Sequence, residues 1–323
     1  MRLDLRASAA GFLGAAAVLG ALAYLVGVED LLSALSLAEP SVAGAVLAAA
    51  AVWLTAWALA LRTAVYAGVL FANNVTPFGQ AGGEPVSALL ISEAAGTEYE
   101  TALAAIAGAD SLNFLPSTAI GLVGVTYFSA TVAAGDRLRW ATAAVVALSV
   151  AIPVAGVLTW RHRRRLEAAV VGLLAPLVRV VGRSVPRLEA PPRSSVAARV
   201  GGFFESVEVV GTDRRTLVAA VGLSTLGWLA QATALWLALY AVGVVAPVAA
   251  VLVAVPVGAI AGVTPLPGGL GGIEAVLITL LVPLAGIGAP TAAAAVVLHR
   301  GAIYWLPTLL GGGVVSALGA ARM

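Results

Sequence analysis

Long apolar stretches separated by short polar breaks run along the whole chain. The expected membrane spans share an apolar character and few charges, and they cover residues 7–28, 40–61, 101–134, 138–160, 217–242, 246–261, 274–287 and 289–320. Because one span needs roughly 20 apolar residues, the 323 residues have room for about eight of them. The pattern therefore predicts an all-α polytopic membrane protein with about eight transmembrane helices.

Two segments interrupt this pattern with helix-breaking residues and a carboxylate. Residues 73–85 contain Asn-Asn-Val-Thr-Pro and Gly-Gly-Glu-Pro, and residues 263–274 contain Pro-Leu-Pro-Gly-Gly-Leu-Gly-Gly-Ile-Glu. Unpaired backbone groups have no water partner in hydrocarbon, so irregular chain survives there only where protein buries it or a wet cavity solvates it. Short apolar runs flank both segments. We therefore expect two re-entrant or broken helix hairpins.

The two interruptions belong to similar surroundings, which predicts an internal repeat. Asp110 follows Glu84 by 26 residues, and Arg300 follows Glu274 by 26 residues. The offset between the copies is about 190 residues. This divides the chain into a first transmembrane repeat (1–159), a central loop (160–215) and a second transmembrane repeat (216–323).

The central loop is strongly basic. It holds 11 arginines against five acidic residues. Basic segments beside membrane spans stay on the cytoplasmic side, so the loop is expected to be cytoplasmic in a multi-pass protein of the cell membrane. Apolar residues at helical spacing between Val196 and Val210 predict an amphipathic helix on the membrane surface. The arginines are not interleaved with aromatic residues, which argues against nucleic-acid binding.

Composition narrows the chemistry further. The chain is 61% hydrophobic and 11% charged, with a mean hydropathy of +1.01. It has no cysteine and only two histidines. These counts exclude disulfides and thiolate metal sites and argue against a metal or another cofactor. Without a nucleophile or metal set, an integral membrane enzyme is also disfavoured.

Four charged residues fall inside the apolar segments: Glu84, Asp110, Glu274 and Arg300. A charge at mid-bilayer costs about 2.5 to 3.5 kcal/mol on insertion scales, so each one needs a partner or water. Two readings stay open for these groups. Glu84 and Glu274 either bind substrate or cap half-helices, and Asp110 with Arg300 forms either a structural ion pair or a substrate clamp. His299 is either a packed residue or a proton relay.

Two glycine pairs complete the candidate site. Gly82 with Gly83, and Gly268 with Gly269, lie where a half-helix begins, and their N–H groups could form an anion nest suited to phosphate. Close helix packing is the alternative role for such pairs. We expect both hairpins to line one shared hydrated pocket, in which a phosphate group meets Arg300 and the carboxylates receive a cationic or hydroxylated group.

The chain also resembles the transmembrane region of lysylphosphatidylglycerol synthases. The resemblance rests on the two interrupted segments and on Leu298-His299-Arg300 through Tyr304-Trp305-Leu306-Pro307, and it covers nearly the whole chain. It implies a lipid flippase that handles a phospholipid or an isoprenoid-phosphate carrier. In full-length members a separate soluble domain synthesises the aminoacylated lipid. This chain ends directly after its last span, so we expect translocation without synthesis.

One further class of function stays open at this point. The chain could act as a non-transporting membrane partner of an envelope lipid or glycan enzyme. In that case the buried charges would be replaceable, whereas changes in the basic loop would disrupt a complex. The oligomeric state, monomer or homo-oligomer, is not fixed by the sequence.

Overall fold

The computed structural model describes residues 5–61, 65–76, 79–131, 161–184 and 214–320, together with a few residues between 154 and 201. Every regular element in this part of the chain is helical, and it contains no strand. The helices of the first half are α1 (Leu5–Val26), α2 (Val28–Ser36), α3 (Pro40–Ala60), α4 (Tyr66–Val75), α5 (Gln80–Ala95) and α6 (Tyr99–Thr131). The helix of the central region is α8 (Arg163–Ser184).

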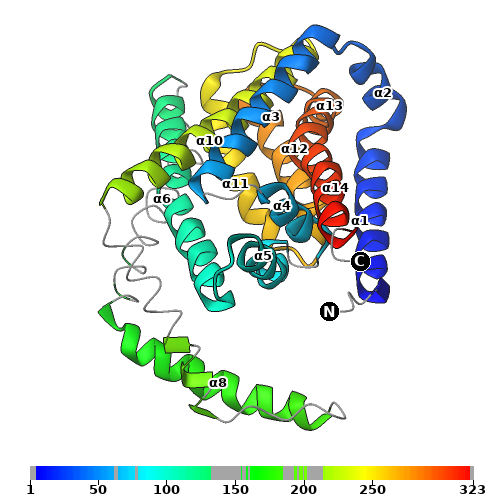
Figure 1. Cartoon of the computed structure of the whole chain (residues 1–323). Helices are drawn as coiled ribbons and strands as arrows, with labels where there is room; N and C mark the ends of the chain where they lie inside the picture. The colour runs from blue at the N-terminus through cyan, green and yellow to red at the C-terminus, as the bar shows by residue number, and fades with distance from the viewer. Residues whose placement is uncertain are drawn as a thin grey trace.

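The second half continues with a similar series. Its elements are α10 (Arg214–Ala241), α11 (Val248–Ile260), the 3₁₀ turns η1 (Ala261–Val263) and η2 (Pro267–Gly269), α12 (Gly272–Ala285), α13 (Ala289–Arg300), the π-helical turn η3 (Gly301–Trp305) and α14 (Leu306–Ala320). Figure 1 shows both halves intermingled in one bundle, with α8 apart from it. The all-α prediction is therefore confirmed for the described residues.

Four helical segments of the described chain are long and apolar enough to cross a membrane. They are Pro40–Ala60, Arg214–Ala241, Pro267–Ala285 and Ala289–Ala317. A fifth arises if α1 and α2, which are bent by 84° at Gly27, count as one span. The expected total of about eight stays a prediction, because the interrupted helices are individually short and the expected span at 138–160 lies almost wholly outside the described residues.

Both predicted interruptions are real breaks in the helices. In the first half α4 ends at Val75 and α5 begins at Gln80, and these two short helices pack against each other. In the second half α11 ends at Ile260, and α12 begins at Gly272 after the turns η1 and η2. Those two helices also pack together. Each half thus contains a pair of short helices joined at a break, as the Pro and Gly residues predict.

The described helices of the two halves follow each other at a nearly constant offset. Helices α5 and α12 are each followed by a C-cap glycine, Gly96 and Gly286. Both glycines adopt the left-handed conformation, with φ of 64° and 67°. The next helices, α6 and α13, begin at Tyr99 and Ala289. Glu84 and Glu274 then occupy similar places near the starts of α5 and α12.

Packing between the halves is reciprocal. Helix α4 packs against α14, and α11, which occupies the place of α4 in the second half, packs against α6. Helices α3 and α10 form the most extensive contact in the bundle and run side by side (Figure 1). Each broken pair is therefore held by a helix of the opposite half.

Large apolar and aromatic side chains fill the α3–α10 contact. Leu235 and Leu239 are fully buried. Trp57 makes edge contacts with Trp53 and Trp228, at ring-centroid distances of 5.6 and 5.9 Å. Trp228 therefore packs within this aromatic cluster. Leucine and valine side chains remain exposed on the outside of the bundle, as expected for a surface that faces lipid.

The central region contains a helix that the sequence did not predict. The amphipathic helix expected at 196–210 stays a prediction, because residues 202–213 lie outside the described part of the chain. The unexpected element is the 22-residue helix α8, which begins within the arginine cluster at Arg163. Apolar side chains such as Leu173 are exposed on it. Several prolines and arginines in this region obscured the helical period in the sequence.

Candidate functional site

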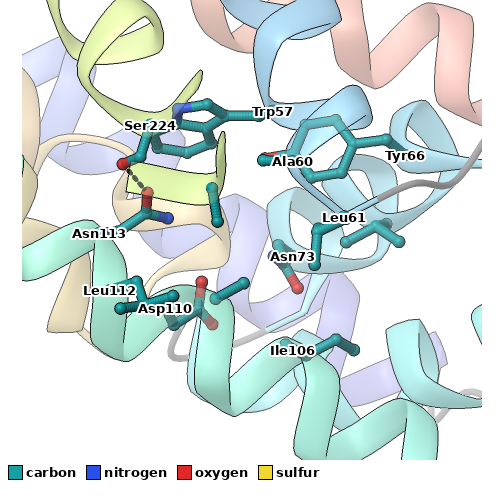
Figure 2. Close-up of a pocket in the computed structure, with 13 residues that line it drawn as sticks. Trp57, Ala60, Leu61, Tyr66, Asn73, Ile106, Asp110, Leu112, Asn113 and Ser224 are labelled. Atoms are coloured by element: carbon teal, nitrogen blue, oxygen red, sulfur yellow. Dashed lines mark hydrogen bonds between the residues drawn. The ribbon is translucent and has the colours of Figure 1, made fainter. Parts of the chain in front are cut away.

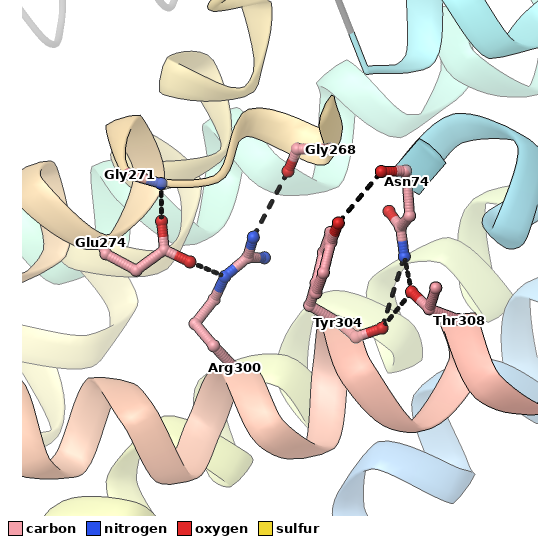
Figure 3. A network of polar contacts seen from close by, with 7 residues as sticks. All are labelled: Asn74, Gly268, Gly271, Glu274, Arg300, Tyr304 and Thr308. Atoms are coloured by element: carbon pink, nitrogen blue, oxygen red, sulfur yellow. Dashed lines mark hydrogen bonds and ion pairs between the residues drawn. The ribbon is translucent and has the colours of Figure 1, made fainter. Parts of the chain in front are cut away.

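A buried ion pair lies at the second break. Arg300 Nε donates a hydrogen bond of 2.6 Å to Glu274 Oε1, and these side chains are only 9% and 8% exposed. Arg300 Nη2 also donates to the carbonyl oxygen of Gly268, at 3.3 Å. The guanidinium carbon lies 4.7 Å from the centre of the Tyr304 ring. Arg300 is therefore fixed by the break itself and by the turn that follows α13 (Figure 3).

The same glutamate caps the helix that follows the break. Glu274 Oε2 accepts a hydrogen bond of 2.6 Å from the backbone N–H of Gly271, the N-cap residue of α12. A carboxylate at this place satisfies an unpaired N–H group and complements the helix dipole. The structure thus shows the capping role expected for Glu274, and its role in substrate binding stays a prediction. The negative group at this helix start comes from the protein itself.

A second polar cluster joins the two breaks to each other. Asn74, at the end of α4, donates through Nδ2 to Thr308 Oγ1 at 2.7 Å and to the carbonyl oxygen of Tyr304 at 3.4 Å. The Tyr304 hydroxyl donates in return to the carbonyl oxygen of Asn74, at 3.0 Å. Tyr304 lies in the π-helical turn η3, a type of turn that is frequent at functional sites. The first break is therefore anchored to the second half by side chains (Figure 3).

The candidate glycines occupy crowded positions. Gly268 and Gly269 have φ of +55° and +68°, which side-chain-bearing residues rarely adopt. A Cβ atom on Gly268 would overlap the Tyr304 ring. A Cβ atom on Gly83 would overlap Asn73 of α4. These contacts support the packing role for Gly83, and Gly82 lies beside it on α5, partly buried.

The charged residues of the first half form a different kind of pair. The carboxyl groups of Glu84 and Asp110 share a hydrogen bond, and Asp110 also interacts with Asn113 one turn further along α6. Both Glu84 and Asp110 are partly buried. Unlike Glu274, Glu84 does not cap its helix, because the N-cap of α5 is Gly79 and no side chain caps it there.

Asp110 lines a small cavity between α3, α4, α6 and α10 (Figure 2). Its polar and aromatic lining residues are Trp57, Tyr66, Asn73, Asp110, Asn113 and Ser224. Ser224 of α10 donates a hydrogen bond to Asn113 Oδ1 of α6 and thereby closes one side. The cavity has a volume of about 30 Å³. That is room for water and far less than the roughly 300 Å³ of a small-molecule site.

Two expectations about the site are corrected by this geometry. The Asp110–Arg300 ion pair does not form, because Asp110 is paired with Glu84 and Arg300 is paired with Glu274. The cavity described here is also not shared by both breaks, since Asp110 lines it and neither Glu274 nor Arg300 does. Tyr304 and Asn74 occupy the space where the two breaks meet.

Other residues of the site were not predicted from the sequence. Trp57, Tyr66 and Ser224 line the cavity, although their sequence positions carry no signal for this role. Asn113 was visible as a polar interruption of an apolar stretch, yet its partner Ser224 lies 111 residues away. His299 is 4% exposed and lies against α10 near Gln231, which supports the packing role for this side chain.

Comparison with known proteins agrees with the resemblance noted in the sequence. Residues 8–311 match the family described as lysylphosphatidylglycerol synthase TM region. A UPF0104 membrane protein of Methanothermobacter thermautotrophicus is 30% identical over 75% of this chain and 69% of its own length. A second UPF0104 membrane protein of that organism is 26% identical over 77% of this chain and 72% of its own length. The chain is thus a multi-pass membrane protein.

Proposed function

This chain belongs to the lysylphosphatidylglycerol synthase TM region family, and from that premise we propose that it is a lipid flippase. It moves a phospholipid, or another lipid with a phosphate-linked head group, between the two leaflets of the cell membrane. The observation that carries the proposal is the meeting of two broken helix pairs at Asn74, Gly268 and Tyr304, with a charged pair beside each break.

The proposed flippase is built from two repeats. The constant offset of the described helices, the matching left-handed glycines and the reciprocal packing of α4 with α14 and α11 with α6 all support a repeat. Transporters of this kind bind substrate near the repeat interface, where broken helices meet. We further propose about eight spans in total and a cytoplasmic central loop, because α8 and its surroundings carry the arginine cluster.

Charged groups in the two halves would serve different parts of a lipid head group. Arg300 has five N–H donors, of which Glu274 and Gly268 engage two, so its remaining donors are available for phosphate oxygens. Glu84 and Asp110 would accept hydrogen bonds from a cationic or hydroxylated group. The acyl chains would stay in the bilayer against the exposed apolar side chains of the bundle.

Transport requires that the site open. The cavity of about 30 Å³ is too small for a head group, so the proposed transport needs a state in which this space is wider. Movement of one repeat against the other would break the contact of Gly268 with Tyr304 and widen the space beside Asp110. The lipid head would then be exposed to one leaflet at a time.

Reconstitution with fluorescent phospholipids tests this function. Purified protein in vesicles is expected to move lipid at least tenfold faster than protein-free vesicles, by the usual dye-quenching assay of the outer leaflet. Glu84→Gln is expected to lower the rate about tenfold, the effect of losing one charge-assisted hydrogen bond of roughly 1.4 kcal/mol. Glu29→Gln, on an exposed residue of α2, serves as the matched control and keeps the wild-type rate.

Lipid exchange without acceleration by the protein would contradict the proposal. If wild-type protein and empty vesicles exchange lipid at the same rate, the flippase proposal fails and the non-transporting partner becomes the better description. Mass spectrometry of the vesicle lipids checks the companion proposal that the chain is not an enzyme, since new lipid species would contradict it.

A further inference from the structure

Equivalent glutamates in the two halves have partners of opposite chemistry. Glu274 of α12 pairs with Arg300 of α13, 26 residues later in the chain. Glu84 of α5 pairs with Asp110 of α6, the residue at the same separation. In each half the partner comes from the helix that follows the broken pair and packs against it. The architecture is thus the same, but a cation neutralises only one of the two glutamates.

A hydrogen bond between two carboxyl groups requires a proton on one of them. Two ionised carboxylates have acceptor oxygens only, so they repel each other and cannot form the contact between Glu84 and Asp110. In the second half the guanidinium of Arg300 supplies both the positive charge and the N–H donor. In the first half, a proton shared by Glu84 and Asp110 supplies the positive charge and the hydrogen-bond donor. Arginine does not release its proton in proteins, whereas a carboxyl group does.

The surroundings of Glu84 and Asp110 allow that proton to exchange with water. Asp110 faces the cavity, which is large enough for water. Of the described residues that line it, Tyr66 of α4 is the other titratable group, and α3 and α10 contribute uncharged side chains there. Helix α11, packed against α6, has no charged residue along its length. No described lining residue carries a positive charge that could replace the proton.

We propose that Glu84 and Asp110 form a proton-binding site that couples proton movement to lipid movement. The proton leaves the shared hydrogen bond for water in the cavity, and the pair changes from one negative charge to two. A cationic or hydrogen-bond-donating group of the lipid head then binds between the two carboxylates. When the head group leaves, a proton returns and the pair closes. This inference rests on the proposed flippase function.

Infrared spectroscopy tests the proton site without any transport. The C=O stretch of a protonated carboxyl group is separate from that of a carboxylate, and it shifts in heavy water. Wild-type protein in lipid is expected to show this band at neutral pH and to lose it on titration to high pH. Asp110→Asn, which keeps the shape and can donate to Glu84, is expected to remove the band. Glu84→Gln is expected to do the same, and Glu29→Gln to leave it unchanged.

A pH gradient across the vesicle membrane tests the coupling. With one proton exchanged per lipid, each pH unit is expected to shift the distribution of lipid between leaflets by up to about tenfold in wild-type protein. Asp110→Asn is expected to abolish this response. An unchanged carboxyl band in both carboxamide variants overturns the proton site even if lipid still moves. Lipid movement that ignores the gradient overturns the coupling alone, and absence of any movement overturns the coupling together with the flippase proposal.

Discussion

Replacing Arg300 with methionine is expected to lower the free energy of unfolding by about 3 to 5 kcal/mol. Loss of one partner from a buried ion pair leaves the other charge unpaired, and this costs far more than the pair itself contributes. Here the unpaired buried charge would be the carboxylate of Glu274, whose side chain is 8% exposed. Equilibrium unfolding in mixed detergent and SDS micelles, followed by tryptophan fluorescence, measures the change.

Two further variants make this result specific. Glu274→Gln together with Arg300→Met removes both charges while Gln keeps an acceptor for the Gly271 N–H group, so the double variant is expected to regain much of the lost stability. Arg161→Met changes an exposed arginine and is expected to shift the free energy of unfolding by less than about 0.5 kcal/mol. If Arg300→Met unfolds like the wild type, the ion pair does not hold the second break.

Gly268→Ala is expected to be strongly destabilising. Its φ of +55° is strained for alanine, at a cost of roughly 1 to 2 kcal/mol. The new Cβ atom would also overlap the Tyr304 ring and crowd Asn74, which adds about 1 to 3 kcal/mol. The total of roughly 2 to 5 kcal/mol is measured by the same unfolding assay.

Gly286→Ala separates these two contributions. Gly286 has a φ of +67°, but no atom lies within 4 Å of the place where its Cβ would stand. This variant is therefore expected to lose only the backbone part, about 1 to 2 kcal/mol. Equal losses for Gly268→Ala and Gly286→Ala would mean that the contact between Gly268 and Tyr304 does not form.

The positions of the helices could be predicted from the sequence to a large extent. Prolines and glycines inside apolar sequence marked both breaks. Helix α8 was missed because arginines and Pro176 interrupt its apolar residues. The 84° bend after α1 was also missed, since nothing in the sequence around Gly27 specifies an angle.

The candidate site was only partly predictable. Charged residues within apolar sequence carry a free-energy cost in a membrane and need partners. This criterion identified Glu84, Asp110, Glu274 and Arg300. The choice of partner depends on which helices pack together, and spacing within one half gave no means to rank Asp110 against Glu274 as the neighbour of Arg300. Contacts such as Asn74 with Tyr304 join residues 230 positions apart, and no local pattern reports them.

The dependence of each broken pair on the opposite half sets a requirement on how the protein is made. Helix α4 packs against α14, and its last turn is fastened to Tyr304, which leaves the ribosome 230 residues later. At ~5–20 residues per second this delay is roughly 12 to 45 s. During that time the N-terminal hairpin lacks its neighbour from the second half, so its polar break needs other hydrogen-bond partners until Tyr304 has been made.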